Sequence, residues 1–372
     1  MMFWFLASFL LHIVLFWRVP VIQRDCNPRH FSNVRKTSVI IPARNEENNL
    51  PNLLNSIQRQ EVQPMEIIVV NDGSTDRTKE IALRKGVRVI DAPPIEHGWQ
   101  GKSWACWQGA NAANGDYLLF IDADAWFEDG GLLRIMGAYQ QQLGKGIMTI
   151  HPYHKIRDWY EVFSSIFHLV TFASIGSSNI YSTPNSLSGG FGQFLYCRSF
   201  DYFKIGGHRE IRSAVVENME LAKLAKSKNE SISAWSGKDA VSMRMYPNGK
   251  KEMIYGWSKS FFSGALQTNP INFLLIVFWI TASLSFIFSG IGTLFSEPIL
   301  VLLCIITYIW ALTLSLRKIG NFHFMDLLLF PLHLLAFVGI FFYSIYLTFF
   351  TKSSTWKGRS IITSKEKEEN LE

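Results

Sequence analysis

The chain has 372 residues, of which 48% are hydrophobic and 14% aromatic, and its formal net charge is +6. This length allows one large domain or two, and so apolar a composition is unusual for a soluble protein. The cysteines at positions 26, 106, 197 and 304 form no CxxC pair, which argues against a disulfide framework or a zinc site. They are expected to be small buried hydrophobic residues.

The first apolar stretch, residues 1–17, contains one histidine and no formal charge. The next segment, residues 18–36, carries five basic side chains against one acid, Asp25. A cleaved signal peptide has its positive charge before the apolar run and a small-residue cleavage site after it, and this segment has neither. We therefore expect an uncleaved N-terminal transmembrane anchor (1–17) and a basic juxtamembrane linker (18–36) on the cytoplasmic side.

Two later apolar segments, 271–293 and 298–316, are uncharged and long enough to cross a bilayer, and their short connection predicts a hairpin. A third segment, 327–350, contains Pro331 and His333 and is either one tilted span or a re-entrant piece plus a short span. Basic residues flank it on both sides, so charge leaves the number of crossings after residue 320 open.

These segments predict a C-terminal transmembrane region at 270–350 and a tail at 351–372 that is first basic and then acidic. The expected protein is multi-pass in the cell membrane, with its central region facing the cytoplasm. Most of the basic excess lies beside the apolar segments, which suits anionic lipid and not nucleic acid.

Between residues 37 and 145, short apolar runs typical of strands alternate with segments of helical period. Strands are expected at 37–43, 65–72, 87–93 and 116–124, and helices at 46–58, 75–85 and 101–114. This alternation predicts right-handed βαβ units and therefore an α/β fold with a mainly parallel, doubly wound sheet.

Polar motifs follow the strands of this sheet: PARNEE, NDGSTD, DAPP and DAD. Ligands bind at the carboxyl ends of strands in such sheets, so the motifs are expected to converge on one edge. A dinucleotide-binding fold shares the alternation, but it needs GxGxxG after the first strand, where this chain has PARNEE. A Walker A motif is missing from the sequence as well.

The residues at this edge suit a nucleotide diphosphate sugar. Asp72 can accept a hydrogen bond from the imide of uracil or from ribose hydroxyls. Asp122 and Asp124 end the fourth expected strand, where alternate residues point to one face, and they suit Mg²⁺ or Mn²⁺ with phosphate oxygens completing the shell. Such a cation would neutralise a diphosphate as it leaves the sugar. Lys102, at the start of a helix, can add a second positive charge.

In order and spacing, the motifs IIPARNEE, NDGSTD, GKSWA and DAD resemble those of the inverting glycosyltransferases of family 2, which have the GT-A fold. The resemblance implies that residues 37–150 form the nucleotide-sugar half of a GT-A domain. It also implies that Asp122 and Asp124 hold the metal and phosphates, with Asp124 catalytic, and that Lys102 lies near the pyrophosphate. The residues implied to contact the nucleoside are Pro42, Ala43, Glu46 and Asp72.

Residues 151–269 are expected to form the acceptor half, with 159–180 either buried core or an interfacial segment on the membrane. The motifs HPYH, FGQFLY, IGGH, GWSKS and, in the tail, WKGR resemble a membrane-bound bacterial branch of the family that acts on a C30 carotenoid acid, 4,4'-diaponeurosporenoate. The resemblance implies a lipid acceptor, UDP-glucose as donor and other carotenoid-pathway enzymes as partners. It places Trp257, Trp356 and Arg359 at the acceptor site, although either tryptophan would equally suit an interfacial anchor.

One departure from the family concerns the acceptor side, which usually carries a Glu-Asp pair whose second carboxylate deprotonates the acceptor hydroxyl. Here Glu217 is followed by Asn218, which cannot act as a base. Either Glu217 has the catalytic role, with Glu220 as a nearby alternative, or no strong base is needed. A carboxylic acid acceptor would explain the second option, because its pKa of about 4 leaves it ionised at neutral pH.

The predicted function is transfer of a hexose to a lipid acceptor, with inversion, by a membrane-bound hexosyltransferase. One alternative is a transferase acting on polyprenyl phosphate, hopanoid or diacylglycerol. Another is a processive polysaccharide synthase, for which the spans are few, and a third is a non-catalytic lipid-binding scaffold, which Asn218 would suit. His151, His154 and His208 are expected to be hydrogen-bonded structural residues and not ligands.

Overall fold

The structure is a computed structural model that describes residues 1–23, 31–142, 144–183, 187–214, 216–350, 354–356 and 359–361. The chain forms two compact units. The α/β unit comprises Ile22–Pro152, Gly189–Arg244 and Tyr346–Glu372, and the helical unit comprises Met1–Val21, Tyr153–Ser188 and Met245–Ile345. Each unit is therefore assembled from segments that are far apart in the sequence.

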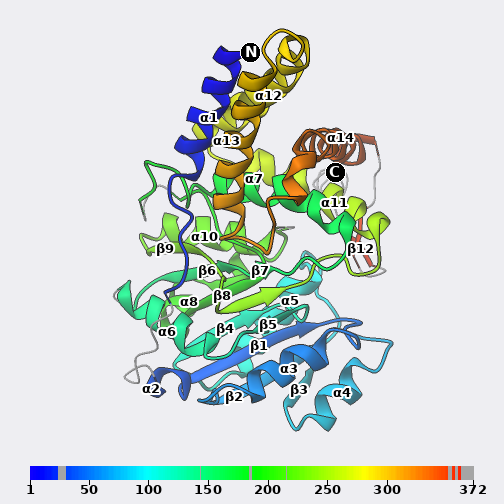
Figure 1. The fold of residues 1–372 in the computed structure, drawn as a ribbon. Helices are drawn as coiled ribbons and strands as arrows, with labels where there is room; N and C mark the ends of the chain where they lie inside the picture. Colours follow the sequence, from blue (N-terminus) through cyan, green and yellow to red (C-terminus); the bar gives the residue numbers. More distant parts are fainter. Residues whose placement is uncertain are drawn as a thin grey trace. The chain divides into compact units, whose positions relative to one another are not determined.

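Over the described residues, the α/β unit is built on a seven-stranded sheet in the order β3-β2-β1-β4-β8-β6-β9 (Figure 1). Neighbouring strands are parallel except where β8 pairs antiparallel with β4 and β6. The strands are β1 (Thr37–Ala43), β2 (Glu66–Asn71), β3 (Arg88–Asp91), β4 (Tyr117–Ile121), β6 (Ile147–His151), β8 (Phe194–Arg198) and β9 (Ile232–Ser236). The predicted mainly parallel α/β sheet is confirmed, with one antiparallel strand in its middle.

Strand β1 lies inside the sheet, and all of its residues except Pro42 are buried, which explains the unbroken apolar run TSVIIPA. Helix α5 (Gly101–Ala112) packs on β1 at very short range. A Cβ atom at Gly109 would lie 2.4 Å from Cγ2 of Ile40, so only glycine allows this approach. The close packing fixes the start of α5 relative to the carboxyl edge of the sheet.

The remaining elements of the α/β unit connect or extend this sheet. Helix α3 (Leu50–Gln58) buries Leu50, Leu53, Leu54 and Ile57, which recur three and four residues apart along one face. The other helices are α2 (Phe31–Val34), α4 (Thr78–Arg84), α6 (Gly131–Gln141), α8 (Ser199–Ile205), α9 (Gly207–Glu210) and α10 (Glu217–Ser227). Antiparallel pairs join β5 (Ala125–Phe127) to β10 (Val241–Met243) and β11 (Ser354–Trp356) to β12 (Arg359–Ile361).

Three helical segments are long and apolar enough to cross a membrane, as far as the chain is described. They are α12 (Pro270–Thr293), α13 (Pro298–Leu316) and the run Asp326–Phe350, in which a 3₁₀ turn, η3 (Asp326–Leu329), leads into α14 (Phe330–Phe350). Pro331 lies in the first turn of α14, where its missing N–H leaves the helix intact. The third apolar segment is thus one continuous helical run.

The N-terminal helix α1 (Met2–Phe16) is apolar but has only 15 residues. It packs against α12 and α13 (Figure 1). His12 Nε2 lies 3.1 Å from Ser315 Oγ and 3.3 Å from the Ala311 carbonyl oxygen, and the ring of Phe16 meets Trp279 edge-on. The N-terminal helix therefore belongs to the same helix bundle as the later apolar helices α12 and α13.

The segment predicted as either buried core or membrane-surface helix forms a 3₁₀ turn, η2 (Trp159–Ser164), followed by helix α7 (Ser165–Ile175). Most residues of α7 are buried, whereas Trp159 is 71% exposed. Within the helical unit, Phe167 of α7 stacks on Trp257 of helix α11 (Lys250–Gln267). Buried packing therefore accounts for α7, and Trp159 is the part of this segment that faces out.

Candidate active site

An ion-pair cluster occupies the carboxyl edge of the sheet in the α/β unit. Lys102 Nζ lies 2.7 Å from Asp122 Oδ1 and 2.6 Å from Glu217 Oε1. The same ammonium donates a hydrogen bond to the carbonyl oxygen of Gly192 at 2.9 Å. The side chains of the three charged residues are 22%, 26% and 12% exposed, respectively. The structure therefore brings three of the predicted site residues together at a partly open surface.

Each of these groups comes from the end of a regular element. Lys102 is in the first turn of α5, Asp122 directly follows β4, and Glu217 is the first residue of α10. Strand β4 ends at Ile121, so Asp122 and Asp124 lie in the turn before β5 and not on the extended strand that we predicted to reach residue 124. The two-residue period of a strand therefore does not place these carboxylates.

The charges of the cluster shift each other's pKa values. Burial raises the pKa of Asp122, the neighbouring Lys102 opposes this, and Glu217 and Glu46 add to the rise, which brings the value to about 6. Burial opposes the charge of Lys102, but the carboxylates of Asp122 and Glu217 outweigh it and raise the pKa of the ammonium. Lys102 is therefore a permanent cation that lies between two carboxylates, those of Asp122 and Glu217.

The loops after β1 and β2 carry the residues predicted to contact the nucleoside. Pro42 and Ala43 end β1 and pair with Val70 and Asn71 at the end of β2. Asp72 follows directly, is only 3% exposed, and donates its backbone N–H to the Ala43 carbonyl oxygen at 2.9 Å. Asp72 thus lies at the same carboxyl edge as the ion-pair cluster, as the motif spacing predicts.

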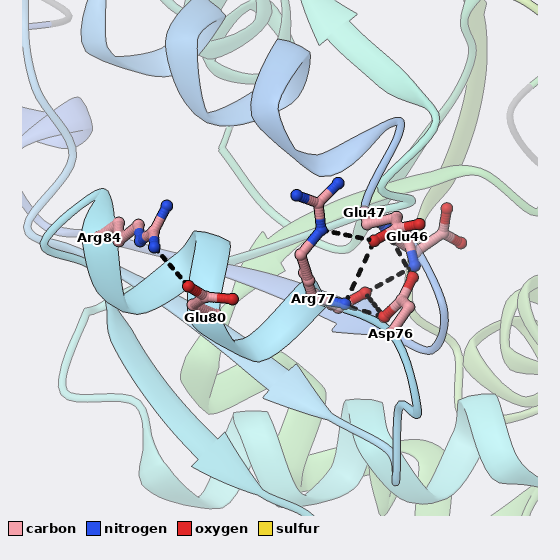
Figure 2. A network of polar contacts seen from close by, with 7 residues as sticks. Glu46, Glu47, Asp76, Arg77, Glu80 and Arg84 are labelled. Carbon is pink, nitrogen blue, oxygen red and sulfur yellow. Dashed lines mark hydrogen bonds and ion pairs between the residues drawn. The ribbon is translucent and has the colours of Figure 1, made fainter.

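A polar network holds these two loops together (Figure 2). The backbone N–H of Glu47 donates to Asp76 at 3.0 Å, and Arg77 Nε donates to Glu47 at 3.2 Å. Partial burial opposes ionisation of Asp76, but hydrogen bonds from Thr78 and Glu47 outweigh it and lower its pKa. The backbone N–H of Glu46 donates to Thr78 Oγ1 at 2.7 Å. Glu47 and Asp76 therefore fix the loop that carries Glu46, a role that sequence reasoning missed.

Asp122 and Asp124 lie two residues apart in the turn between β4 and β5 and offer two carboxylates, donors of the kind that a divalent cation uses when substrate completes its shell. The described residues contain no group of three or more His, Cys, Asp and Glu placed to hold a metal. Mg²⁺ is commonly bound by one or two carboxylates plus substrate phosphates, which two aspartates at a strand end can supply. Because Lys102 already pairs with Asp122, a cation there would compete with the ammonium for that carboxylate.

The three residues predicted at the acceptor site are not brought together by the described contacts. Trp257 belongs to the helical unit, where its indole N–H donates to Ser164 Oγ at 3.0 Å and its ring stacks on Phe167. Trp356 and Arg359 are paired positions of the β11–β12 hairpin, and their side chains lie outside what the structure describes. The acceptor role of all three stays a prediction.

The histidines singled out in the sequence, and the cysteines that the structure describes, are buried inside the protein. His151, His154 and His208 are buried, and their Nδ1 atoms lie 2.9, 2.8 and 2.9 Å from the Pro152 carbonyl oxygen, His168 Nε2 and Tyr202 Oη, respectively. Cys106, Cys197 and Cys304 are free and buried, as expected, and Cys26 lies outside the described residues.

Asn218 has a partner set that sequence reasoning did not foresee. Its side-chain amide donates to the carbonyl oxygens of Phe191 and Gly192, at 3.2 and 2.8 Å. Gly192 O is also the acceptor for Lys102, so Asn218 is linked to the ion-pair cluster through one peptide group. The only sequence signal was the glycine-rich stretch GGFGQ that precedes β8.

Comparison with known proteins identifies the family. The model for glycosyl transferase family 2 matches residues 38–204. The 4,4'-diaponeurosporenoate glycosyltransferase of Staphylococcus aureus (strain USA300) is 32% identical over 339 residues, which cover 90% of this chain and 90% of the relative. The chain belongs to glycosyltransferase family 2. The enzyme of the same name from Staphylococcus haemolyticus is 34% identical over 338 residues and covers 89% of this chain.

Among solved structures, the mannosyltransferase of Pyrobaculum calidifontis in complex with GDP-Man and Mn²⁺ aligns with a TM-score of 0.52 at 13% identity. The alignment covers 92% of this chain and 93% of that one. At this identity the likeness concerns the fold alone, and it agrees with the predicted GT-A sheet. The protein is therefore a glycosyltransferase with a GT-A-like domain and three apolar helices that could span a membrane.

Proposed function

We propose that this glycosyltransferase transfers glucose from UDP-glucose to the carboxylate of 4,4'-diaponeurosporenoate, with inversion, at the cytoplasmic face of a membrane. The observation that carries the proposal is the cluster of Lys102, Asp122 and Glu217 at the carboxyl edge of the sheet. Similarity to the staphylococcal enzymes over about nine tenths of the chain supports the choice of acceptor.

On the donor side, the loops after β1 and β2 would hold the nucleoside. Asp72 and Glu46 would accept hydrogen bonds from uridine. The network of Figure 2 fixes the backbone of Glu46, and a hydrogen bond to the Ala43 carbonyl oxygen fixes that of Asp72. Asp122 and Asp124 would hold Mg²⁺ or Mn²⁺, which would supply positive charge to the departing diphosphate. Lys102 would add its own charge to the same phosphates, since its ammonium is held within 3 Å of Asp122.

On the acceptor side, a carboxylate needs orientation more than deprotonation. The unperturbed pKa of a carboxylic acid is about 4, so the acceptor is already a nucleophile at neutral pH. Asn218 offers no base, and Glu217 is paired with Lys102 at 2.6 Å. In this proposal the ammonium lowers the repulsion between Glu217 and an incoming anionic acceptor, and Glu217 in turn keeps Lys102 in place.

The three long apolar helices support a membrane enzyme with a lipid acceptor. The basic residues that follow α1 in the sequence support a cytoplasmic position for the α/β unit, where nucleotide sugars are made. Trp257 and the tail residues Trp356 and Arg359 are the proposed acceptor-site residues contributed from outside the sheet.

The test is an assay of membranes that contain the protein, with labelled UDP-glucose and one lipid at a time. The expected result is a glucosyl ester of the C30 acid, cleaved by mild alkali, with the β configuration that inversion of the α-linked donor requires. The corresponding C30 alcohol, a polyprenyl phosphate, a hopanoid and diacylglycerol serve as competing acceptors. Transfer to one of these and not to the acid would overturn the proposed acceptor, and polymer formation would point to a synthase.

A further inference from the structure

The side chain of Asn218 is 4% exposed and faces hydrogen-bond acceptors. Its amide nitrogen lies 2.8 Å from Gly192 O and 3.2 Å from Phe191 O, so both N–H groups are used. A carbonyl oxygen has two lone pairs, and Gly192 O uses the second to accept from Lys102 at 2.9 Å. One carbonyl thus joins the amide of α10 to the ammonium of α5.

Close packing between the glycine-rich turn and α10 makes this arrangement specific. A Cβ atom at Gly189 would lie 2.6 Å from Met219 Cγ, and one at Gly190 would lie 2.6 Å from Thr149 Cγ2 and 3.3 Å from the Asn218 carbonyl oxygen. At Gly192 a Cβ atom would meet nothing within 4 Å. The turn is therefore tightly packed against α10 at Gly189 and against β6 and α10 at Gly190, whereas Gly192, whose carbonyl oxygen accepts from Lys102, has open space around its Cα.

A carboxylate at position 218 would be incompatible with these contacts. Its oxygens would lie against two carbonyl oxygens, and acceptors that face each other in a buried site are costly. It would also add a second negative charge beside Glu217, where Lys102 already balances two carboxylates. Only a neutral donor with two N–H groups satisfies both carbonyls and keeps the charge of the cluster unchanged.

We propose that Asn218 is a positioning residue: its amide fixes the Phe191–Gly192 turn so that the Gly192 carbonyl holds Lys102 between Asp122 and Glu217. Asn218, which stands where the family usually has an acid, thus supports the donor site structurally and does not indicate that a catalytic base has been lost. The inference rests on the proposed function for the role of Lys102 toward the donor diphosphate.

The experiment compares Asn218→Asp and Asn218→Ser with the full-length wild type in detergent at pH 5.5 and pH 8. A serine hydroxyl can satisfy one carbonyl at either pH, whereas the introduced carboxyl can do so only while protonated. Because it faces two carbonyls and Glu217, its pKa in the folded state is expected to be raised above the ordinary value. Relative to wild type, Asn218→Asp should therefore be most stable and most active at low pH and lose both as pH rises.

The expected size follows from an unpaired buried charge. At pH 8 the turnover of Asn218→Asp should be reduced about 10- to 100-fold more than at pH 5.5, each relative to wild type at the same pH. The loss of turnover in Asn218→Ser should be smaller than that in Asn218→Asp at pH 8, and it should be the same at pH 5.5 and pH 8. Other titratable groups of the surrounding elements, Lys102, Asp122, His151, His208, Arg209 and Glu210, are common to all variants, so the ratio to wild type removes their contribution.

Asn111→Asp is the matched control. Asn111 is exposed on α5 and its amide also donates to a backbone carbonyl, that of Trp107, at 2.8 Å. The same chemical change there should leave turnover and its pH dependence as in wild type. A merely structural role for Asn218 would lower stability without this pH-dependent loss of turnover.

Two further measurements, binding of UDP-glucose and thermal unfolding, need no acceptor. If the wild type binds UDP-glucose but leaves the C30 acid unmodified, the proposed acceptor fails while these measurements still test Asn218. Wild-type stability and donor affinity in Asn218→Asp at pH 8 would overturn the positioning role. Higher turnover in Asn218→Asp on a hydroxyl acceptor would show instead that the position is a vacant base site.

Discussion

Replacing Lys102 with methionine is the sharpest test of the ion-pair cluster. The change keeps most of the aliphatic chain and removes the charge that lies 2.7 Å from Asp122 and 2.6 Å from Glu217. Two unit charges at that separation attract by about 6 kcal/mol at an effective dielectric constant of about 20, and loss of hydration offsets part of this. Removing one partner of a buried pair costs about 3–5 kcal/mol, and partial exposure favours the lower end.

We therefore expect Lys102→Met to destabilise the α/β unit by about 3 kcal/mol, which corresponds to a fall of about 6–12 °C in its melting temperature. The assay is thermal unfolding in detergent with a chelator present, so that no divalent cation replaces the ammonium. In a separate assay of glucose transfer without the chelator, the turnover of Lys102→Met should fall by about 100-fold or more. The reason is that a positive charge at the phosphates is lost.

The matched control is Lys79→Met. Lys79 lies 2.6 Å from Asp91, a distance like that in the cluster, but the two side chains are 48% and 57% exposed. An exposed pair contributes about 0–1 kcal/mol, so this variant should stay close to wild type. If Lys102→Met were as mild as Lys79→Met in both stability and turnover, the reasoning that the cluster is a tight, functional ion-pair site would be refuted.

Three further outcomes are expected. The pKa of Asp122 is raised to about 6, so its carboxylate takes up a proton as pH falls through that value. The Mn²⁺ affinity measured at pH 5 should therefore be well below the affinity at pH 7.5, and equal affinities would contradict this. On a carboxylate acceptor, Glu217→Gln should keep far more turnover than the same change leaves in an enzyme that acts on hydroxyls. Loss as complete as in Asp124→Asn would reject the view that no strong base is needed. Gly190→Ala should lower the melting temperature, since its Cβ atom would lie 2.6 Å from a methyl carbon of β6, whereas Gly192→Ala, which meets open space, should not.

The first half of the sheet could be predicted from the sequence because its signals are local. The runs that became β1, β2, β3 and β4 are apolar, short and bounded by polar motifs, and the structure places each strand within three residues of the expected limits. The polar ends of these strands converge because parallel strands share a carboxyl edge, which is a property of the topology and not of any single residue.

The second half of the sheet depends on contacts between distant segments, and no local period encodes them. Strand β8 inserts antiparallel between β4 and β6, and its pairing partners lie in separate parts of the chain. The packing of α1 is similar, since His12 meets Ser315 across 303 residues of sequence. Hydropathy predicted these apolar helices individually, but it carries no information on which of them pack together.

The site shows the same division between what a motif specifies and what geometry decides. The motifs identified Lys102, Asp122 and Glu217, and the resemblance assigned Lys102 to the pyrophosphate, yet nothing in the spacing indicated that one ammonium lies between both acids. For Asn218 the sequence allowed three readings: Glu217 acts as the base, no strong base is needed, or the protein is catalytically dead. The structure favours a fourth reading, because an amide that donates to two carbonyls is using the one property that an acid in its place would lack.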